Sequence, residues 1–289
     1  MNYILHLLIM IGIYLMLTYG LNLVVGFGGL LSLCQAVFYG IGAYACSLFM
    51  MKAGLGFLPS LTLSVLLTGF FAVLIGLPAL RFRGDPFVIV TLGFQIIIFT
   101  LLYNWVGLTR GPYGIPGIPR PIIAGYEITE VPEYLALVAI CLSILLLVIF
   151  ILYKSPFGLA LKTLRDNEMA AEGLGKAPVR LFLSAFVISA MIAAVAGSLY
   201  ATYVTFIDPT SFTLDESIFI LTILLVGGAG NKMGPLAGTV FMVLLPELLK
   251  FLGLPDTVAA NVRQMIYGFA LILLMFLRPQ GIAGDFKVK

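Results

Sequence analysis

Long apolar runs separated by short polar or glycine- and proline-containing links dominate the chain. A membrane-spanning helix needs about 20 predominantly apolar residues, so the runs predict about eight or nine such spans. We therefore expect an all-α fold: a polytopic transmembrane bundle that forms a single domain over residues 1–289. The expected spans are 3–19, 32–51, 58–80, 85–105, 134–153, 181–204, 217–226, 236–251 and 262–277.

Composition supports this class of protein. Hydrophobic residues make up 61% of the 289 residues and charged residues only 10%, with a mean hydropathy of +1.13. Soluble domains contain about 45–50% apolar and about 25% charged residues. The net charge of +3 is small and its cations lie mostly in the links, so binding to nucleic acid is not expected.

Two segments, 20–29 and 227–234, are interrupted by glycines where the flanking sequence is apolar. Backbone that leaves the helix at membrane depth must face protein or a water-filled cavity, and glycine-broken segments in two halves of a chain point to a transport pathway. Tight turns at the membrane surface remain the alternative, and an internal repeat is left open. The candidate pathway residues in these segments and in the adjoining spans are Asn22, Gly26, Gly28, Gly29, Gln35, Thr91, Gln95, Gly227, Gly228 and Gly230.

The longest polar interval, residues 154–180, contains five of the sixteen Lys and Arg residues. Its first part predicts a helix with Phe157, Leu161 and Leu164 on one face and Lys162 and Arg165 on the other. Asp166 or Asn167 is then expected to cap a second short helix that Gly175 ends. The surface of this second helix is rich in Ala and Gly, which indicates that it sits in a groove on another protein.

Lys and Arg between membrane spans mark the cytoplasmic side. Placing residues 154–180 in the cytoplasm puts eleven of the sixteen cations on that side. With nine crossings, the N-terminus is then outside and the C-terminus is cytoplasmic.

Small residues recur at every fourth position of the span 181–204, a pattern that lets two membrane helices approach closely. We expect one packing face, with Ile192 on the opposite face, from the following residues: Ala185, Ser189, Ala193, Gly197 and Ala201.

No catalytic, metal-binding or cofactor-binding pattern is present in the sequence, and it contains a single His. A P-loop is also missing, so we expect a transport subunit rather than an enzyme, with ATP hydrolysis supplied by partner subunits. A stand-alone secondary transporter is the rival interpretation, but its coupling site would normally need a charged residue inside a span. The polar residues within the apolar spans are uncharged, and Glu247, the one near candidate, is expected by the outer end as a solvated interfacial residue.

Six motifs, which together extend over nearly the whole chain, resemble the second of the two paired permeases of bacterial and archaeal ABC importers for branched-chain amino acids. They are GLNLVVGFGGLLSLCQAVFYGIGAY (20–44), RFRGDPFVIVTLGF (81–94), LTRGPYGIPGIP (108–119), SPFGLALKTLRDNEMAAEGLGK (155–176), LVGGAGNKMGPLAG (225–238) and RPQGI (278–282). The resemblance implies a multi-pass protein of the cytoplasmic membrane that works with a second homologous permease, two ABC ATPases and an extracytoplasmic solute-binding protein. Urea or short amides are the alternative substrates within the same importer class.

Within residues 154–180, Glu168, Ala171 and Gly175 resemble the glutamate–alanine–glycine core by which such permeases contact their ATPases. The expected ATPase-coupling residues are Arg165, Asp166, Asn167, Glu168, Ala170, Ala171, Glu172, Gly173 and Gly175.

Overall fold

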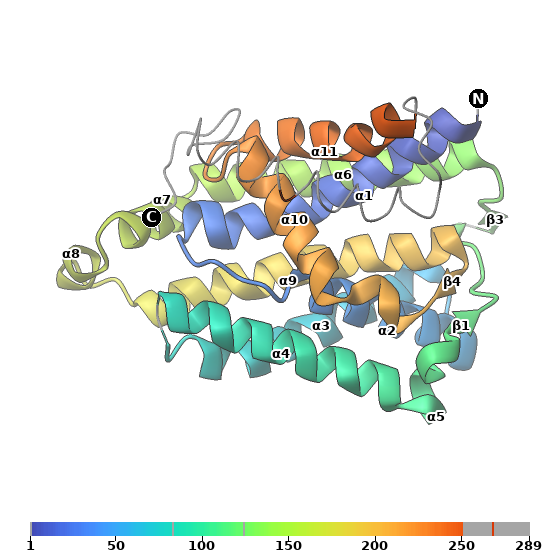
Figure 1. The fold of residues 1–289 in the computed structure, drawn as a ribbon, viewed down its shortest axis with the longest axis horizontal. Helices are drawn as coiled ribbons and strands as arrows, with labels where there is room; N and C mark the ends of the chain where they lie inside the picture. The colour runs from blue at the N-terminus through green and yellow to red at the C-terminus, as the bar shows by residue number, and fades with distance from the viewer. Residues whose placement is uncertain (1, 83, 124, 251–267, 269–289) are drawn as a thin grey trace.

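The structure, a computed structural model, describes residues 2–82, 84–123, 125–250 and 268. Most of the long helices lie roughly side by side along the longest axis of the molecule (Figure 1). They are α1 (Asn2–Asn22), α2 (Gln35–Lys52), α3 (Phe57–Ala79), α4 (Asp85–Asn104), α6 (Val131–Lys154), α9 (Pro178–Val204) and α11 (Gly234–Lys250). Helix α10 (Leu214–Gly227) crosses them obliquely. The mostly helical character expected from the sequence is confirmed.

Shorter elements join the long helices. The short helices are the π-helix η1 (Leu23–Phe27), α5 (Val106–Thr109), the 3-10 helices η2 (Gly111–Tyr113) and η3 (Pro209–Phe212), α7 (Pro156–Asp166) and α8 (Glu168–Gly173). Two antiparallel strand pairs complete the described elements, β1 (Ile115–Pro116) with β4 (Phe206–Ile207) and β2 (Ile122–Ile123) with β3 (Tyr126–Glu127).

Among the described residues, five helical segments are long and apolar enough to cross a membrane. They are Tyr3–Phe27, Phe57–Ala79, Pro86–Asn104, Val131–Lys154 and Pro178–Val204. The shorter helices α2, α10 and α11 correspond to the expected spans 32–51, 217–226 and 236–251. The expected span 262–277, apart from Gly268, lies outside the described residues.

Several helices begin at the prolines and capping residues of the sequence. Proline occupies the first turn of α4, α6, α7 and α9, where its missing N–H costs no hydrogen bond and its fixed φ suits the helix. Glu130 and Glu133 add a capping box at the start of α6.

The bundle has two distinct ends (Figure 1). The links α3–α4 and α10–α11 lie at the end that carries α7 and α8, which we call the loop end. The N-terminus, α5 and the short strands lie at the opposite, far end. The cation-rich interval and the basic link between α3 and α4 therefore share one end of the molecule.

Helix α2 packs along α9 at the centre of the bundle, and every residue of α2 from Gln35 to Ser47 is buried. A Cβ added to Gly42 would lie 2.3 Å from the Ala194 Cα, and one added to Gly197 would lie 2.1 Å from the Tyr39 carbonyl oxygen. All five members of the predicted small-residue face of α9 are buried, so the prediction of a packing face is confirmed. Ile192 was expected on the opposite face, but it is also buried and borders Gly20 of α1, because α9 is surrounded on several sides.

Replacement of Gly197 by leucine is expected to prevent stable folding, because the new side chain would have to displace backbone of α2 rather than a flexible side chain. Overpacking of this kind costs about 1–3 kcal/mol or more. Gly93→Leu in α4 is the matched control, since a Cβ there meets nothing within 4 Å. Thermal unfolding of the purified variants measures the effect, and equal stability of the two variants would contradict the close approach.

The first glycine segment differs from the expectation. Helix α1 does not end near Tyr19 but continues through Gly20 to Asn22 and then as a π-helix to Phe27. The non-helical backbone lies later, at 28–34, and α2 begins only at Gln35. Gly20 and Gly26 are both helical, and their small size serves close packing instead of a break: an added Cβ would lie 3.1 Å from Ile192 Cγ2 at Gly20 and 2.3 Å from the Gly230 nitrogen at Gly26.

Helices α2 and α10 both start inside the bundle. The backbone N–H of Ala36, in the first turn of α2, donates to Ser217 Oγ of α10 at 2.9 Å. Just before these helices, Leu33 N–H donates to Thr91 Oγ1 and the Phe212 carbonyl accepts from Gln95, both on α4. Two interrupted segments, 28–34 and η3, thus reach the interior and are held there by polar side chains.

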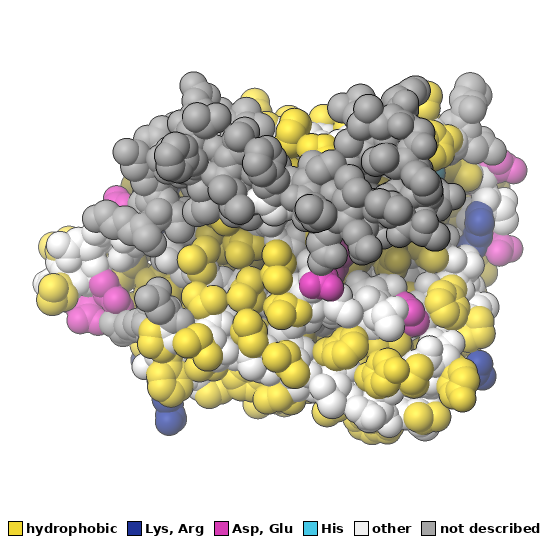
Figure 2. Space-filling view, viewed as in Figure 1, with side chains coloured by type: hydrophobic (Ala, Val, Ile, Leu, Met, Phe, Trp, Pro, Cys, Tyr) yellow, Lys and Arg dark blue, Asp and Glu magenta, His cyan; other side chains and the backbone are white. Residues whose placement is uncertain are grey.

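Large apolar side chains are exposed along α3, α4 and α6, and they gather over α4 in Figure 2. Phe70, Ile89 and Ile144 have 59%, 70% and 61% of their surface exposed. Such a continuous apolar exterior is expected where lipid or another membrane subunit covers the protein.

Candidate functional site

The two glycine segments meet at Asn22, a fully buried side chain at the end of α1. Its Oδ1 accepts from the Gly230 N–H at 2.9 Å, and its Nδ2 donates to the Asn231 carbonyl and to Tyr153 Oη, each at 3.0 Å. The amide of one residue thereby satisfies backbone groups of a loop more than 200 positions away. Buried backbone groups outside helices need such partners, and Asn22 supplies them.

Gly26 makes this junction possible. A Cβ on Gly26 would lie 2.3 Å from the Gly230 nitrogen and 2.1 Å from Asn22 Oδ1. No side chain fits in that space, so the π-helix contacts the α10–α11 link through backbone alone. We refer to Asn22, Gly26, Gly230 and Asn231 as the glycine junction.

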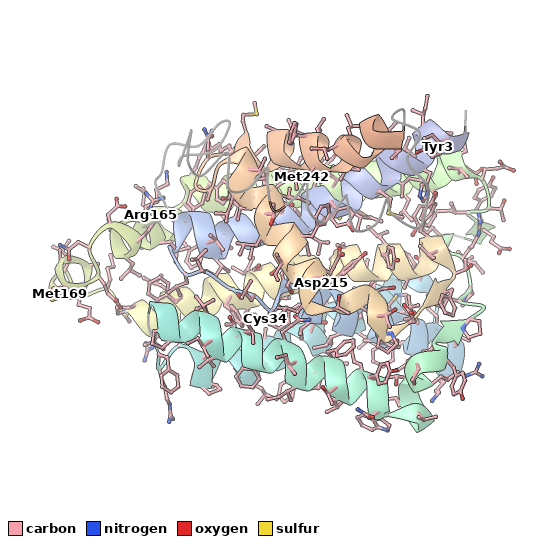
Figure 3. All side chains as sticks on the ribbon, in the orientation of Figure 1. Tyr3, Cys34, Arg165, Met169, Asp215 and Met242 are labelled. Carbon is pink, nitrogen blue, oxygen red and sulfur yellow. The ribbon has the colours of Figure 1, made fainter. Side chains whose placement is uncertain are left out.

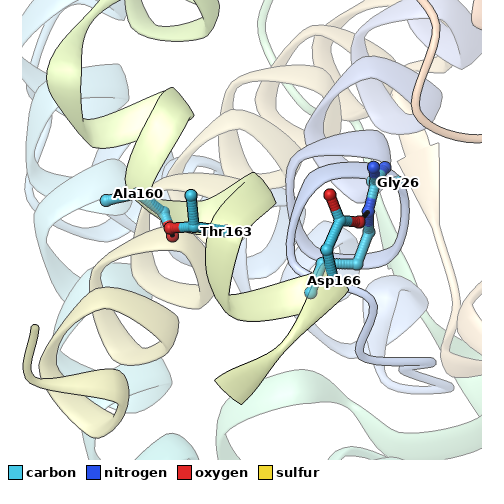
Figure 4. Close-up of polar contacts among 5 residues, drawn as sticks. Gly26, Ala160, Thr163 and Asp166 are labelled. Carbon is cyan, nitrogen blue, oxygen red and sulfur yellow. Dashed lines mark hydrogen bonds and ion pairs between the residues drawn. The ribbon is translucent and has the colours of Figure 1, made fainter. Parts of the chain in front are cut away.

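Arg165, at the end of α7, reaches the glycine junction from the polar loop. Its Nη1 donates to the Gly26 carbonyl at 2.7 Å, and its side chain is only 12% exposed. The stem crosses Gly29, where φ is +71° and an added Cβ would lie 2.7 Å from Arg165 Cγ. Arg165 was expected on the polar face of its helix, so its inward position corrects that expectation. Figure 4 shows Gly26 beside the end of α7, near Asp166.

Packing of α7 explains how Arg165 is positioned. Leu161 and Leu164 are buried and Phe157 packs against the same core, so the apolar face predicted for this helix is confirmed. Lys162 Nζ lies 4.9 Å from the centre of the Phe27 ring in the π-helix. The Phe27 ring is itself stacked on Tyr153 with centroids 3.8 Å apart. Helix α7 is therefore fixed against the π-helix over its length.

A second polar cluster lies where α2 and α10 begin. Ser217 Oγ donates to Gln95 Oε1 at 3.1 Å, and Gln95 Nε2 donates to the Phe212 carbonyl at 3.0 Å. On the other side, Ser189 Oγ donates to Gln35 Oε1 at 3.2 Å. Gln35, Thr91 and Gln95 are all buried. Thr91 binds segment 28–34 and Gln95 binds η3, whereas Gln35, the first residue of α2, donates to the Leu17 carbonyl of α1.

The remaining pathway candidates are held in close backbone packing. A Cβ on Gly227 would lie 2.0 Å from the Gly234 carbonyl oxygen, where α10 and α11 cross. Gly228 ends α10 with φ +111°, and a Cβ on Gly28 would lie 2.6 Å from the Val24 carbonyl oxygen. The ten candidates thus form two groups, one around the glycine junction and one around Gln95.

The short helix α8 has the caps that its sequence requires. Asn167 Oδ1 accepts from the Ala170 N–H at 3.0 Å, so Asn167 rather than Asp166 is the N-cap. At the other end Gly175 has φ +77° and the Lys176 N–H donates to the Ala171 carbonyl at 3.1 Å, an arrangement typical of helix C-termini. The predicted helix and its stop are confirmed.

Helix α8 projects from the loop end with an apolar tip (Figures 1 and 3). Met169 and Leu174 have 83% and 77% of their surface exposed, and Ala170, Glu172 and Gly173 are exposed beside them. Ala171, expected on the contact surface, is only 2% exposed and belongs to the core of this chain. The sequence interpretation stressed the small residues and missed Met169 and Leu174, whose signal was two large apolar side chains in a polar interval.

In the described part of the chain, no group of three or more His, Cys, Asp or Glu side chains could hold a metal ion. The polar chemistry of the site consists of amides, hydroxyls and one guanidinium that bind backbone groups and one another.

Comparison with known proteins places the chain in a family. A model of the family described as branched-chain amino acid transport system / permease component matches residues 3–275. The chain belongs to this family. It is 38% identical to the high-affinity branched-chain amino acid transport system permease protein LivM of Salmonella typhimurium, over 93% of this chain and 67% of the relative. LivM of Escherichia coli is 37% identical over the same shares.

More distant relatives include the guanosine ABC transporter permease protein NupQ of Bacillus subtilis, 27% identical over 59% of this chain and 56% of the relative. No solved structure matches the chain. The family consists of transport components, which agrees with the expectation of a transport subunit rather than an enzyme.

Proposed function

We propose that this chain is a membrane-spanning permease subunit of an ATP-driven importer that moves branched-chain amino acids across the cytoplasmic membrane. Family membership supports the substrate class, through relatives whose names specify branched-chain amino acid transport. The observation that carries the mechanism is the Arg165 contact with Gly26, because it joins the polar loop to the interrupted core of the bundle.

In this proposal residues 1–289 form one permease domain with an ATPase-coupling loop at 154–180. A second homologous permease completes the membrane unit, two ABC ATPases bind at the loop end, and an extracytoplasmic solute-binding protein docks at the far end. The exposed tip of α8 enters the ATPase, with Met169 and Leu174 as its apolar anchors. Large apolar side chains are typical centres of such interfaces.

The proposed topology has the N-terminus outside and the loop end in the cytoplasm. Segment 28–34 with α2, η3 with α10, and α11 provide three crossings in addition to the five long helices. A ninth crossing near 262–277, outside the described residues, would bring the C-terminus into the cytoplasm.

Uptake by the complete complex tests the function. The chain is reconstituted in liposomes with its partner permease, ATPases and solute-binding protein, and labelled leucine, isoleucine, valine, urea and acetamide are compared with and without internal ATP. ATP-dependent uptake of the branched-chain amino acids is the expected result. Preferential uptake of urea or acetamide would identify the other substrate class, and ATP-independent uptake by this chain alone would support a secondary transporter.

A further inference from the structure

A cluster of tyrosines and carboxyl groups lies between the start of α10, the C-terminal half of α9 and α2. The ring centroid of Phe212 lies 5.1 Å from that of Tyr39, 6.0 Å from that of Tyr44 and 6.2 Å from that of Tyr200. Asp208 precedes η3, and Glu216 is in the first turn of α10. We call these six residues the tyrosine–carboxyl cluster.

Two buried oxygen atoms of this cluster have no hydrogen-bond partner among the described residues. They are Tyr44 Oη and Glu216 Oε1. Tyr44 is only 3% exposed, so its hydroxyl lies away from the surface. An unpaired buried hydroxyl destabilises a fold, and an unpaired buried carboxylate oxygen does so more strongly. Such a cost is expected where a ligand supplies the missing donor.

The two charged residues of the tyrosine–carboxyl cluster are both acidic. Asp208 interacts electrostatically with the Tyr44 and Tyr200 hydroxyls, and Glu216 with those of Tyr39 and Tyr200. Within the described residues, the Asp208 carboxylate accepts from the hydroxyl groups of Thr210 and Ser211. Across the described ranges, no Lys or Arg forms an ion pair with either carboxyl group.

Stabilisation of the helix start does not explain Glu216. An acidic residue in the first turn interacts favourably with the helix dipole. Asp215 already provides that charge at the surface of the bundle, where Figure 3 labels it. Glu216, the next residue, instead bonds to Tyr14 inside the bundle and keeps Oε1 unpaired.

We propose that the tyrosine–carboxyl cluster is the site where the permease receives the ammonium group of its amino-acid substrate, an inference that rests on the proposed function. Glu216 Oε1 accepts an N–H bond from the ammonium, and Tyr44 Oη beside Asp208 provides a second free acceptor in the same cluster. The rings of Tyr39 and Phe212 provide the aromatic faces that attract a cation and also suit an aliphatic side chain. The cluster lies beside Gln95 and Ser217, where α2 and α10 begin, so an occupant contacts the interrupted segments directly.

Three variants of the full chain, each in the reconstituted complex, test this site by the rate of labelled leucine uptake. Glu216→Gln is expected to lower uptake at least ~10-fold, because it removes the charge that pairs with the ammonium. Tyr44→Phe removes only the unpaired hydroxyl and is expected to lower uptake about threefold while the unfolding temperature stays equal or rises. Asp215→Asn is the matched control, with the same loss of charge one residue away, and should stay within about twofold of wild type.

Normal leucine uptake by Glu216→Gln or by Tyr44→Phe would overturn the site, as would an equal loss in Asp215→Asn. If Glu216→Gln fails to assemble with its partners, Tyr44→Phe against Asp215→Asn decides the question. Absence of leucine uptake by the wild-type complex would contradict the proposed function itself and remove this inference with it, so the two failures are distinguishable.

Discussion

Replacement of Arg165 by methionine is expected to lower ATP-driven uptake about tenfold or more while the ATPase remains bound. Methionine keeps an apolar stem over Gly29 but cannot donate to the Gly26 carbonyl. Hydrogen bonds to a charged group contribute about 1.5–3 kcal/mol, and this one joins the end of α7 to the π-helix. Without it, movement of α8 no longer reaches the glycine junction efficiently.

The measurement is the ratio of substrate moved to ATP hydrolysed in the reconstituted complex, together with the amount of ATPase that co-purifies. Lys176→Met is the matched control, because Lys176 is a cation of the same loop with an exposed side chain. An unchanged ratio in Arg165→Met would show that coupling does not pass through Gly26.

Replacement of Met169 by aspartate is expected to abolish capture of the ATPase at equal membrane level. Met169 is the most exposed of the large apolar side chains that the structure describes, at 83%, and a buried aspartate without a partner would oppose docking. Loss of an interface anchor costs about 2 kcal/mol or more, which corresponds to at least ~30-fold weaker binding. Leu174→Asp should behave similarly.

Tyr113→Asp provides the control, since Tyr113 is 81% exposed but lies in η2 at the far end. Equal ATPase recovery with Met169→Asp and Tyr113→Asp would exclude α8 as the docking element. Ala171→Trp is a poor probe of docking, because Ala171 is buried in its own chain and a larger residue there disturbs α8 itself.

Much of the fold was predictable from the sequence because apolar length and proline position are local signals. Pro86, Pro156 and Pro178 mark helix starts, and the apolar runs that follow Pro86 and Pro178 are long enough to identify the spans. The small-residue face of α9 could also be predicted, since its members recur at a fixed spacing. The burial of Ile192 could not be predicted, because a helix that packs on several sides has no distinct polar face.

The site was less predictable because its contacts are long-range. Glycine in a helix costs about 0.5–1 kcal/mol, so Gly20 and Gly26 read as a break. The structure keeps both helical: a Cβ on Gly26 would lie 2.3 Å from the Gly230 nitrogen, which leaves no room for a side chain, and one on Gly20 would lie 3.1 Å from Ile192 Cγ2, a tight contact. Likewise, helical spacing predicted Arg165 on the polar face of its helix. The structure shows that its side chain turns inward because it donates to the Gly26 carbonyl, a contact that the sequence does not reveal.

Ala171 illustrates the limit for short elements. Helix α8 has six residues, less than two turns, so its sequence contains too little periodicity to separate a buried from an exposed face. That the ATPase-coupling residues lie in and around α8 stays a prediction, and the division into an inner Ala171 and an outer Met169 needed the fold.

The burial of α2 has a consequence for biogenesis. Because every residue from Gln35 to Ser47 is covered by protein, this helix has no face for lipid over that stretch, and much of its cover comes from α9, which begins only at Pro178. During synthesis α2 therefore leaves the ribosome long before its main neighbour exists. Its glycines, Gln35 and Ser47 would meet hydrocarbon if the helix were released into the bilayer alone. We therefore expect α2 to enter the bilayer together with its neighbours rather than alone, and to stay shielded from lipid until α9 has been synthesised.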